Sequence, residues 1–549
     1  MERYWKHLVR GADERTRRFL AERETNPASP ACGGVRGEIL EAKPTVYAMT
    51  TAIACYLTPE SAYYESPALL EALRLGAAFA ARLQREDGSF DYPSCNFYSA
   101  PDTAFCFKRL IAGYRLLTGR GASREELSPL REAYRALLHR AAGAIRDGGF
   151  HTPNHRWAIA AALLQAANLF AGEEDFAVSL RARAAQYLAE GLDCDEDGEY
   201  AERSAGNYNA VVNNAMLALC DETGEARFLD AVRRNLTMML CYLDPDGFLF
   251  TQNSTRQDLG RRDRPDRYFY QYLALAVRDG AARGGVFDAA AHQILADNRA
   301  RGDLAPDCLH ILLNHPELAA HRFTGCGFPR EYRRFFPHSR VLRVSRPGLT
   351  YSVMAGKSDF LYVKRGGLAL CFKLGESLCE TRNFRAETME AGDGVCTLTA
   401  EAKGWYYQPF AEPPATSDWW EMDHTKREKL VSSRLSTAVT IRERENGLSL
   451  TVKTDGLDRL PLRLAICLPA GARLSHPAFS LTAGAGESLL LRDGFLDVRL
   501  GGDALRVGPG FGEHEFSGHY SGEEKNTEGF TVLCGAYTPA ERTIFIETL

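Results

Sequence analysis

Hydrophobic residues follow a helical pattern along the first part of the chain. Up to about residue 325, Ala and Leu recur three and four positions apart, as in ESPALLEALRLGAAFAARLQ and SLRARAAQYLAEGL. This spacing places the apolar side chains on one face of an α-helix. Its repetition predicts a domain of packed helices.

A different pattern begins after about residue 340. Short segments such as LALCFKLG, STAVTIRE and RTIFIETL alternate or are rich in β-branched residues, and Gly, Pro, Asp and Asn separate them. Such segments are typical of antiparallel strands joined by turns. We therefore predict a multidomain α and β protein, with a helical domain over residues 1–325, a connector over 326–345 and an antiparallel β-sandwich over 346–549.

Four similar turns punctuate the helical half, with the sequences EDGSFDY (86–92), RDGGFHT (146–152), EDGEYAE (196–202) and PDGFLFT (245–251). We expect the glycine of each turn to end a helix in the left-handed conformation, and the aromatic residue to pack the turn against the core. The last three turns recur at intervals of roughly fifty residues, a period typical of stacked helical hairpins. About six hairpins fit, which predicts an α/α toroid, with other helical solenoids as alternatives.

Each turn leads into a polar loop. The loops are PSCNFYSAPDTAF, HTPNHRW, AERSAGNYNAVVNNA and TQNSTRQDLGRRDRPDRYF. In a closed ring of hairpins these loops would lie on one face, around the mouth of the central cavity. They would then form a single candidate site, and several converging loops favour a ligand site over a flat surface.

The second loop carries the candidate base. Thr152 and Pro153 are typical of a helix start, which places His155 and Arg156 in the first helical turn. There the helix dipole disfavours a protonated imidazole and attracts anions. A neutral His155 beside Asn154 and Arg156 would suit a base that acts on a substrate with a carboxylate. The alternative role for His155 is a capping or core hydrogen bond.

The third loop carries the candidate acid. Tyr208 lies between two asparagines in GNYN, so its hydroxyl could protonate a leaving oxygen while the amides hold substrate hydroxyls or a carboxylate. Arg203 precedes it, and the fourth loop adds an arginine-rich run that supplies local positive potential. We expect substrate to bind to Asn96, Tyr98, Asp102, His151, Trp157, Asn207, Asn209, Asn253 and Arg256.

The sequence predicts no metal site. His151 and His155 lie four residues apart, as zinc ligands can, but Pro153 separates them and no third ligand follows in register. The segment DCDEDGEYAERS begins like an EF-hand loop, but Ser204 occupies the twelfth position, where the motif requires a glutamate. We therefore expect no cofactor, with a structural divalent cation as the alternative.

Composition narrows the function classes. The 66 basic and 71 acidic residues give a net charge of −5, which argues against a nucleic-acid-binding protein. The charged start MERYWKHLVRGADERTRRFL and the lack of a long apolar run predict a cytoplasmic protein without a membrane span. The 14 cysteines form no CxxC pair, so we expect reduced thiols. The oligomeric state stays open.

The domain order and the loops TPNHRW and ERSAGNYNAVV resemble polysaccharide lyases of the heparinase II/III-like and related groups, including the rhamnose-glucuronate lyases. The resemblance implies β-elimination at a uronic acid, with glucuronate in an anionic oligosaccharide or polysaccharide as the expected substrate. It implies that Asn154 and either Arg156 or Arg203 neutralise the carboxylate, where negative charge grows during the reaction. His155 would be the base and Tyr208 the acid, and the reverse assignment fits equally. Since such lyases often bring a Tyr or His from the sandwich to the cleft, the further candidates are His338, Tyr406, Tyr407 and His424.

Two other functions are compatible with the same loops. A glycoside hydrolase on this scaffold would use a pair of carboxylates. Its candidates are Asp102 together with Glu199, Glu202 or Asp258. The other alternative is a glycan-binding protein without activity, for which the same polar loops would supply the contacts.

Overall fold

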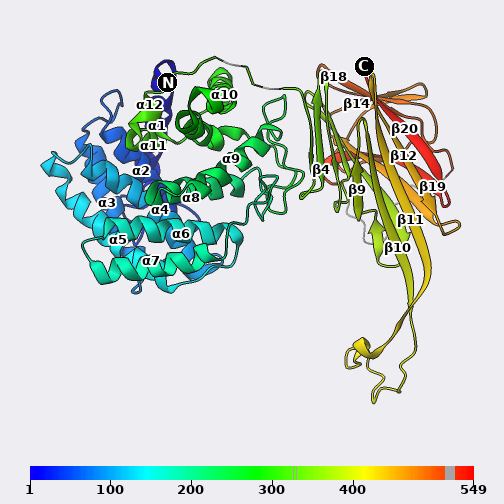
Figure 1. The fold of residues 1–549 in the computed structure, drawn as a ribbon, viewed down its shortest axis with the longest axis horizontal. Helices are drawn as coiled ribbons and strands as arrows, with labels where there is room; N and C mark the ends of the chain where they lie inside the picture. The colour runs from blue at the N-terminus through cyan, green and yellow to red at the C-terminus, as the bar shows by residue number, and fades with distance from the viewer. Residues whose placement is uncertain (326, 329, 514–525) are drawn as a thin grey trace. The chain divides into compact units, whose positions relative to one another are not determined.

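The chain folds into two compact units (Figure 1). A computed structural model describes residues 1–325, 327–328, 330–513 and 526–549, with 281–283 described by their backbone alone. The helical unit comprises Met1–Leu243 and Gly247–Pro329, and the sandwich unit comprises Asp244–Asp246 and Arg330–Leu549. Among the described residues, no helix is both long and apolar enough to cross a membrane.

The helical unit contains twelve α-helices within the described ranges. A short hairpin of β1 (Phe90–Tyr92) and β2 (Asn96–Ser99) lies directly before the fourth helix. The helices are α1 (Glu2–Glu22), α2 (Lys43–Tyr56), α3 (Pro67–Leu83), α4 (Ala100–Thr118), α5 (Ser128–Asp147), α6 (Pro153–Leu169), α7 (Glu174–Ala189), α8 (Tyr208–Thr223), α9 (Ala226–Leu240), α10 (Phe269–Arg301), α11 (Leu309–Asn314) and α12 (Pro316–Ala319).

The helices form an inner and an outer layer, and the sequence explains which helix belongs to which. The helices α2, α4, α6 and α8 pack on one another in turn, whereas α3, α5 and α7 pair with them from outside. In α6, 12 of 17 residues are buried, on all sides of the helix. In α7 only four of 16 are buried, along one stripe. A helix that is apolar all round must be covered on every side, so α6 lies inside.

The two ends of the helical unit meet. His7 Nε2 of α1 lies 2.8 Å from Asn298 Oδ1 of α10, and Arg299 donates a hydrogen bond to the carbonyl of Arg3 at 3.1 Å. The short helix α11 packs on α2 and α4. Because α1 and α10 stand at opposite ends of the helical sequence, these contacts close the layers into a ring. The predicted α/α toroid is confirmed (Figure 1).

The repeated turns differ from the prediction. Gly88, Gly198 and Gly247 have left-handed φ angles of 93°, 94° and 76°, but each closes a tight turn several residues after its helix has ended. At Gly88 and Gly198 an added Cβ would lie 2.2 and 2.3 Å from a backbone carbonyl oxygen, so only glycine fits. Gly148 has a φ of −88°, so the second turn does not use the left-handed conformation. Gly88, Gly198 and Gly247 therefore shape the loops, whereas Gly148 caps the end of α5 without a left-handed conformation.

The sandwich unit contains two nine-stranded sheets within the described residues. One sheet has the order β15-β14-β17-β18-β20-β12-β11-β10-β9, and the other has β16-β19-β13-β7-β6-β5-β4-β3 with β8 paired to β7. Pairing is antiparallel except between β16 and β19. The strands are β3 (Tyr332–Phe336), β4 (Val341–Arg346), β5 (Leu349–Met354), β6 (Leu361–Arg365), β7 (Leu368–Leu378), β8 (Thr381–Asn383), β9 (Thr388–Ala391), β10 (Val395–Tyr407), β11 (Lys429–Arg444), β12 (Gly447–Asp455), β13 (Pro461–Pro469), β14 (Arg473–His476), β15 (Phe479–Thr482), β16 (Ser488–Leu490), β17 (Leu496–Leu500), β18 (Asp503–Gly508), β19 (Gly529–Tyr537) and β20 (Glu541–Thr548).

The segment 326–345, expected to be a connector, contains β3 and most of β4. Strand β3 pairs antiparallel with β4, from Tyr332 with Ser345 to Phe336 with Val341. Two consecutive arginines and several exposed positions conceal its alternation. Polar edge strands of this kind protect a sheet from pairing with another chain, but they resemble loops in the sequence.

A buried ion cluster holds residues 244–246 within the sandwich unit. The guanidinium of Arg343 is fully buried and lies 2.6 Å from Asp244. Lys364 contacts Asp244 at 2.9 Å and Asp246 at 2.7 Å. Burial opposes ionisation of Asp244, but Arg343 and Lys364 together keep its pKa below the usual value. The buried charges are thus paired on both sides.

Candidate active site

The candidate loops deliver their polar residues at the starts of inner helices. Ser99 caps α4, because its hydroxyl accepts a hydrogen bond from the Asp102 backbone N–H at 3.2 Å. A proline occupies the first turn of α4 and of α6. These starts are the ones that Ser or Thr followed by Pro predicts. The first turns of α4, α6 and α8 therefore carry Asp102, His155 and Tyr208.

His155 is a half-buried imidazole that is neutral at physiological pH. Its ring makes edge contacts with Phe105 and with the exposed His151, at centroid distances of 5.7 and 4.7 Å. Burial first, then His151 and Arg256, lower its pKa to about 4, although Asp102 opposes the shift. Its Nδ1 is buried and has no hydrogen-bond partner among the described residues. This ring nitrogen therefore has unused hydrogen-bonding capacity, although it is shielded from solvent in this structure.

Asn154 is oriented by one carboxylate. Glu202 accepts hydrogen bonds from the Asn154 backbone N–H at 3.1 Å and from Nδ2 at 3.0 Å. Arg256 Nε lies 3.4 Å from Glu202 Oε1. Burial raises the pKa of Glu202, and its bonds with Asn154 and the charge of Arg256 counteract this. Asn154 Nδ2 also donates to Thr152 Oγ1 at 3.2 Å, so both of its N–H groups are engaged, and only the buried acceptor Oδ1 has no described hydrogen-bond partner.

Tyr208 is positioned by a loop that is itself fixed. Its backbone N–H donates to Ser204 Oγ at 3.0 Å, and its hydroxyl donates to Gln257 Oε1 at 3.4 Å. Asp258 accepts from Ser204 Oγ and from the Gly206 backbone N–H, each at 2.8 Å. A Cβ on Gly206 would lie 2.9 Å from the Asp258 side chain, so glycine permits this close approach. The Tyr208 hydroxyl is thus presented by a rigid turn.

Arg256 connects these groups. Its guanidinium lies 5.1 Å from the centre of the Tyr208 ring. It pairs with the Glu202 that orients Asn154, and its charge acts on His155. The structure therefore brings His155, Asn154 and Tyr208 together around one cation. From its sequence context Arg256 is predicted only to bind substrate.

Two residues of the loops have strained backbones. Tyr98 and Arg203 have φ angles of 50° and 48°, in the left-handed region that residues with a side chain avoid. Tyr98 is 61% exposed, its N–H donates to Asp91 Oδ1 at 2.8 Å, and Arg85 lies 4.4 Å from its ring centre. Such strain is found most often at functional sites, where surrounding contacts enforce it.

Arg156 and Trp157 do not join the site. Arg156 is buried and donates to the Tyr187 carbonyl at 3.2 and 2.9 Å and to the Gly191 carbonyl, which places it against the end of α7. The Trp157 ring is fully buried and donates to Asp193 Oδ1 at 2.6 Å. A guanidinium held by carbonyls cannot clamp a carboxylate, and a buried indole cannot stack on a sugar. Their predicted substrate contacts are corrected accordingly.

Asn209 and Asn253, predicted to bind substrate, are buried and donate hydrogen bonds to the carboxylate of Glu199. Asn209 Nδ2 donates to Glu199 Oε1 at 3.1 Å, and Asn253 Nδ2 donates to Glu199 Oε2 at 3.3 Å. All three side chains are almost inaccessible to solvent. Burial raises the pKa of Glu199 to about 7. The partly exposed Asn207 instead accepts a hydrogen bond from Arg267.

Asp102 is the centre of a polar cluster at the start of α4. It accepts from Lys43 Nζ and Asn96 Nδ2, both at 3.1 Å, and from Ser99 Oγ at 2.7 Å. Burial opposes ionisation, but Ser99 and Lys43 hold the pKa of Asp102 below its usual value. Lys43 is a member of this cluster that was not predicted, although the pair Lys43-Pro44 resembles the other helix starts.

The four carboxylates of the hydrolase alternative are unsuited to paired acid–base work. Asp102, Glu199, Glu202 and Asp258 are all buried, with exposures of 6%, 2%, 4% and 4%. Each is engaged by the neighbours described above. A hydrolase needs one carboxylate beside the leaving oxygen and another beside the water or the sugar. Among these residues the described contacts leave no such pair exposed.

The candidates from the sandwich unit lie on loops and strand ends. His338 is exposed in the turn between β3 and β4. Tyr406 and Tyr407 end β10, with Tyr406 67% exposed and the Tyr407 ring 4.7 Å from that of Trp405. His424 packs its ring against Trp419 at 3.9 Å. No contact in the described sandwich unit singles out one of them as catalytic.

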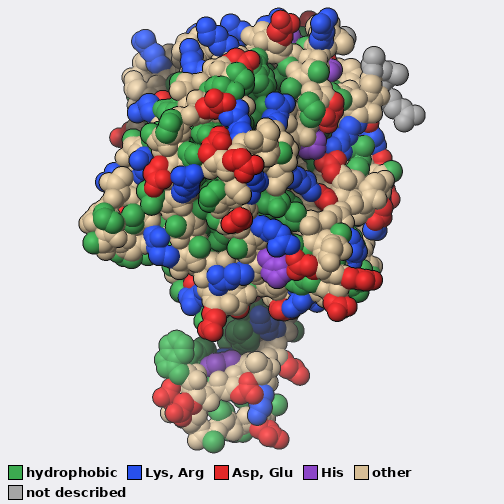
Figure 2. All heavy atoms as spheres, turned by 90° about the vertical axis from the view of Figure 1, so that its left-hand side faces the viewer, with side chains coloured by type: hydrophobic (Ala, Val, Ile, Leu, Met, Phe, Trp, Pro, Cys, Tyr) green, Lys and Arg blue, Asp and Glu red, His purple; other side chains and the backbone are tan. Residues whose placement is uncertain are grey.

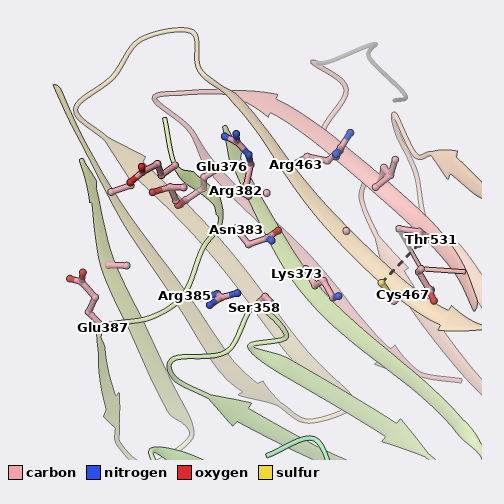
Figure 3. Close-up of a pocket in the computed structure, with 18 of the residues that line it drawn as sticks. Ser358, Lys373, Glu376, Arg382, Asn383, Arg385, Glu387, Arg463, Cys467 and Thr531 are labelled. Carbon is pink, nitrogen blue, oxygen red and sulfur yellow. Dashed lines mark hydrogen bonds between the residues drawn. The ribbon is translucent and has the colours of Figure 1, made fainter. Parts of the chain in front are cut away.

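The sandwich unit also contains a polar pocket of about 500 Å³ (Figure 3). It lies over β7, β8, β13 and β19, and the described residues that line it include no His or Tyr. It therefore lacks the residue types proposed here for proton transfer. Side chains that surround it are Lys373, Glu376, Arg382, Asn383 and Arg463.

Metal-binding groups are not assembled at the loops. The described residues contain no group of three or more His, Cys, Asp or Glu side chains that could hold a metal ion. In the acidic loop, Asp193 accepts from Trp157, and Asp195 accepts from the Glu199 backbone N–H at 2.8 Å. These two carboxylates therefore stabilise the acidic loop through hydrogen bonds to protein groups. On the face of the molecule in Figure 2, basic and acidic side chains are interspersed.

The two-domain fold is that of polysaccharide lyases with an α/α toroid and a β-sandwich. Paenibacillus xanthan lyase aligns with 98% of this chain at a TM-score of 0.62 and 10% identity, and heparinase III aligns with 98% at 0.60 and 10%. Chondroitin AC lyase from Streptomyces coelicolor A3 aligns with 100% of the chain at 0.57 and 11%. The predicted fold is thereby confirmed.

The similarity is one of structure. The sequence matches no protein-family model and no curated protein. The chain covers 57% of the xanthan lyase, 85% of heparinase III and 80% of the chondroitin lyase, so it spans little more than half of the first. At such low identity the likeness establishes the fold, and the activity has to be argued from the site.

Proposed function

We propose that the protein is a lyase that cleaves the glycosidic linkage of a uronic acid, glucuronate, in an anionic oligosaccharide or polysaccharide by β-elimination. The observation that carries the proposal is the grouping of His155, Asn154 and Tyr208 around Arg256. The shared fold supports it, because the structural neighbours are lyases by name and one was solved in complex with chondroitin sulphate.

The difficult step of this reaction is removal of the proton at carbon 5 of the uronate. That proton becomes acidic only when the adjacent carboxylate is neutralised, because the intermediate places further negative charge on it. We assign this role to the guanidinium of Arg256, whose charge acts on His155. Asn154, the predicted partner of the carboxylate, can join it only if its amide exchanges its bonds to Thr152 and Glu202 for bonds to the substrate. Arg203, on the strained loop before Tyr208, is a further candidate. Arg156 is left out, because carbonyl oxygens occupy its donors.

The proton transfers fall to His155 and Tyr208. In the assignment that we favour, neutral His155 takes the proton from carbon 5 and the Tyr208 hydroxyl gives its proton to the oxygen that leaves carbon 4. The bond between carbon 4 and that oxygen breaks as the double bond between carbons 4 and 5 forms. A bound carboxylate would stabilise the imidazolium and raise the pKa of His155 from its low value. The reverse assignment uses the same two residues.

The experiment that tests the proposal follows the ultraviolet absorbance of the conjugated double bond, which only elimination creates. We expect wild-type protein to produce it from glucuronate-containing oligosaccharides. His155→Ala and Tyr208→Phe should each reduce the rate by at least about a hundredfold, the usual contribution of a positioned acid or base. Binding of the same oligosaccharides should persist in Tyr208→Phe, which keeps the ring.

Matched controls separate chemistry from folding. His139→Ala removes an imidazole of the outer helix α5, which contacts Glu173 at 2.8 Å, and Tyr64→Phe removes a hydroxyl from a ring that is 37% exposed. Both controls should retain wild-type rates. Cleavage without the absorbance would support a hydrolase and overturn the proposal. Full activity of both site variants would overturn the assigned roles.

A further inference from the structure

Lys108 is a half-buried cation that the proposed elimination does not use. Residues 1–329 contain only three lysines, which are Lys6, Lys43 and Lys108. Lys6 is exposed on α1, and Lys43 pairs with Asp102 at 3.1 Å. Lys108, on α4, makes no hydrogen bond or ion pair with any described residue. Among the described residues of the helical unit, it is therefore the partly buried lysine without a counterion.

Aromatic rings and another cation surround the Lys108 ammonium. Its Nζ lies 5.1 Å from the centre of the Phe105 ring and 5.8 Å from that of Tyr47. The neighbouring Arg109 is engaged by Asp307 at 3.1 Å and by His310 at 2.9 Å, so no anion is left over for Lys108. Burial, and next the charge of Arg109, lower the pKa of Lys108 to about 7.

An ammonium in this setting is costly. Aromatic faces attract a cation only weakly, and they do not replace the hydration that burial removes. A hydrophobic side chain of similar length would fill the same space without this cost. Ionisable groups perturbed by burial cluster at functional sites, and a ligand with the opposite charge would offset this cost.

The position of Lys108 relates this cation to the candidate active site. The Phe105 ring that faces Lys108 also contacts His155, at 5.7 Å between centroids. One aromatic ring therefore separates the unpaired ammonium from the candidate base. Tyr47 and Phe105 are both partly exposed and could pack against the apolar face of a sugar. A sugar unit beside the reacting uronate would lie within reach of Lys108.

We propose that Lys108, with Tyr47 and Phe105, forms a subsite for an acidic group on the sugar unit adjacent to the uronate that undergoes elimination. This proposal rests on the proposed function. A carboxylate and a sulfate ester share the chemistry that Lys108 would recognise, since each offers several acceptor oxygens to the three N–H donors of an ammonium. The protein would then favour glycans with acidic groups on successive sugars.

The test compares tetrasaccharides that differ in the sugar next to the glucuronate. In a glucuronan fragment every unit carries a carboxylate, in a hyaluronan fragment alternate units are neutral, and in a chondroitin sulfate fragment the neighbour carries a sulfate. Dissociation constants are measured by calorimetry in the Tyr208→Phe background, in which the expected loss of at least about a hundredfold in rate keeps turnover slow during the titration. The variants are Lys108→Met and Lys108→Arg, with Lys6→Met as the exposed control.

We expect Lys108→Met to weaken binding of the glucuronan fragment about tenfold or more, the range for a lost charge-assisted hydrogen bond. Binding of the hyaluronan fragment should change less than about twofold, as for a site without a partner for the lysine. Lys108→Arg should restore much of the loss, and Lys6→Met should have no effect. A tenfold loss with the sulfated fragment as well would show that the subsite accepts either anion.

Some outcomes would overturn the subsite without touching the proposed function. Equal losses for the glucuronan and hyaluronan fragments, or no loss for either, would do so if wild-type protein still forms the unsaturated product. A lower melting temperature of Lys108→Met, together with a similar loss of affinity for every fragment, would also overturn the subsite, because it would indicate a general loss of stability. Absence of both binding and unsaturated product with all three fragments would instead overturn the proposed function, and the subsite with it.

Discussion

Replacing Asp258 should loosen the loop that presents Tyr208. The Asp258 carboxylate is 4% exposed and accepts three hydrogen bonds. Its Oδ1 accepts from Ser204 Oγ at 2.8 Å and from Ser254 Oγ at 2.6 Å, and its Oδ2 accepts from the Gly206 backbone N–H at 2.8 Å. The Ser204 hydroxyl in turn accepts the Tyr208 N–H. Asp258 thus connects the third and fourth loops.

The expected loss in the free energy of unfolding follows from these three hydrogen bonds. Hydrogen bonds to a charged acceptor contribute about 1.5–3 kcal/mol each, so three sum to about 4.5–9 kcal/mol. In Asp258→Ala the two hydroxyls can regain water, and the cost of burying the carboxylate disappears, so we expect a net loss of about 3–5 kcal/mol. In Asp258→Asn the hydroxyls can rotate to accept from the new amide, so we expect about 1–2 kcal/mol.

The assay is urea unfolding followed by the circular dichroism of the helices, with kcat/KM measured on the same samples. The order of stability should be wild type, then Asp258→Asn, then Asp258→Ala. The kcat/KM should fall in the same order, because Tyr208 loses its fixed position. A loss below about 1 kcal/mol for Asp258→Ala would refute the view that this carboxylate organises the site.

Three further predictions follow from the same contacts. Burial lowers the pKa of His155 from 6.5 to about 4, and the neutral imidazole is the form that acts as the base. The kcat/KM should therefore decline only as the pH falls toward 4. A decline centred near pH 6.5 in a pH–rate profile would contradict this assignment. Arg156→Gln should lower stability by about 1–3 kcal/mol in urea titrations yet leave KM unchanged, whereas a large rise in KM would return Arg156 to the binding site. Asp244→Ala should destabilise the sandwich unit by about 3–5 kcal/mol, measured by denaturation, because Arg343 and Lys364 would lose the buried carboxylate that they share; near-wild-type stability would refute the importance of these ion pairs.

Local patterns in the sequence were sufficient to predict where the inner helices begin. Ser99 and Thr152, each followed within two residues by proline, stand at the starts of α4 and α6, and the GNYN segment stands at the start of α8. These signals depend on backbone groups within one turn, so they need no knowledge of the tertiary structure. The positions of His155 and Tyr208 in first helical turns therefore followed from the sequence.

The direction in which each side chain points could not be predicted in the same way. His155, Arg156 and Trp157 are consecutive, and consecutive residues on a helix point about 100° apart. Which of them faces the loops depends on how α6 packs between its neighbours. In the structure, Arg156 and Trp157 turn toward α7 and the acidic loop, while His155 faces Phe105 of α4.

Hydrogen-bonded pairs of residues that are far apart in the chain could not be predicted from the sequence either. Glu202 orients Asn154 from 48 residues away, and Asp258 holds Gly206 from 52 residues away. Nothing in either local sequence marks these partners, because each is one acidic residue among many in the chain. The lack of a counterion at Lys108 is likewise visible only when all of its spatial neighbours are known.

The most direct test of the central claim is the mass and the structure of the cleavage products. Wild-type protein is incubated with a glucuronate-containing oligosaccharide, and the products are examined by mass spectrometry and by proton NMR. Elimination adds no water, so we predict that the product masses sum to that of the substrate and that the new chain end carries a vinylic proton at carbon 4. Products whose masses sum to the substrate plus one water, without a vinylic proton, would show hydrolysis and contradict the account.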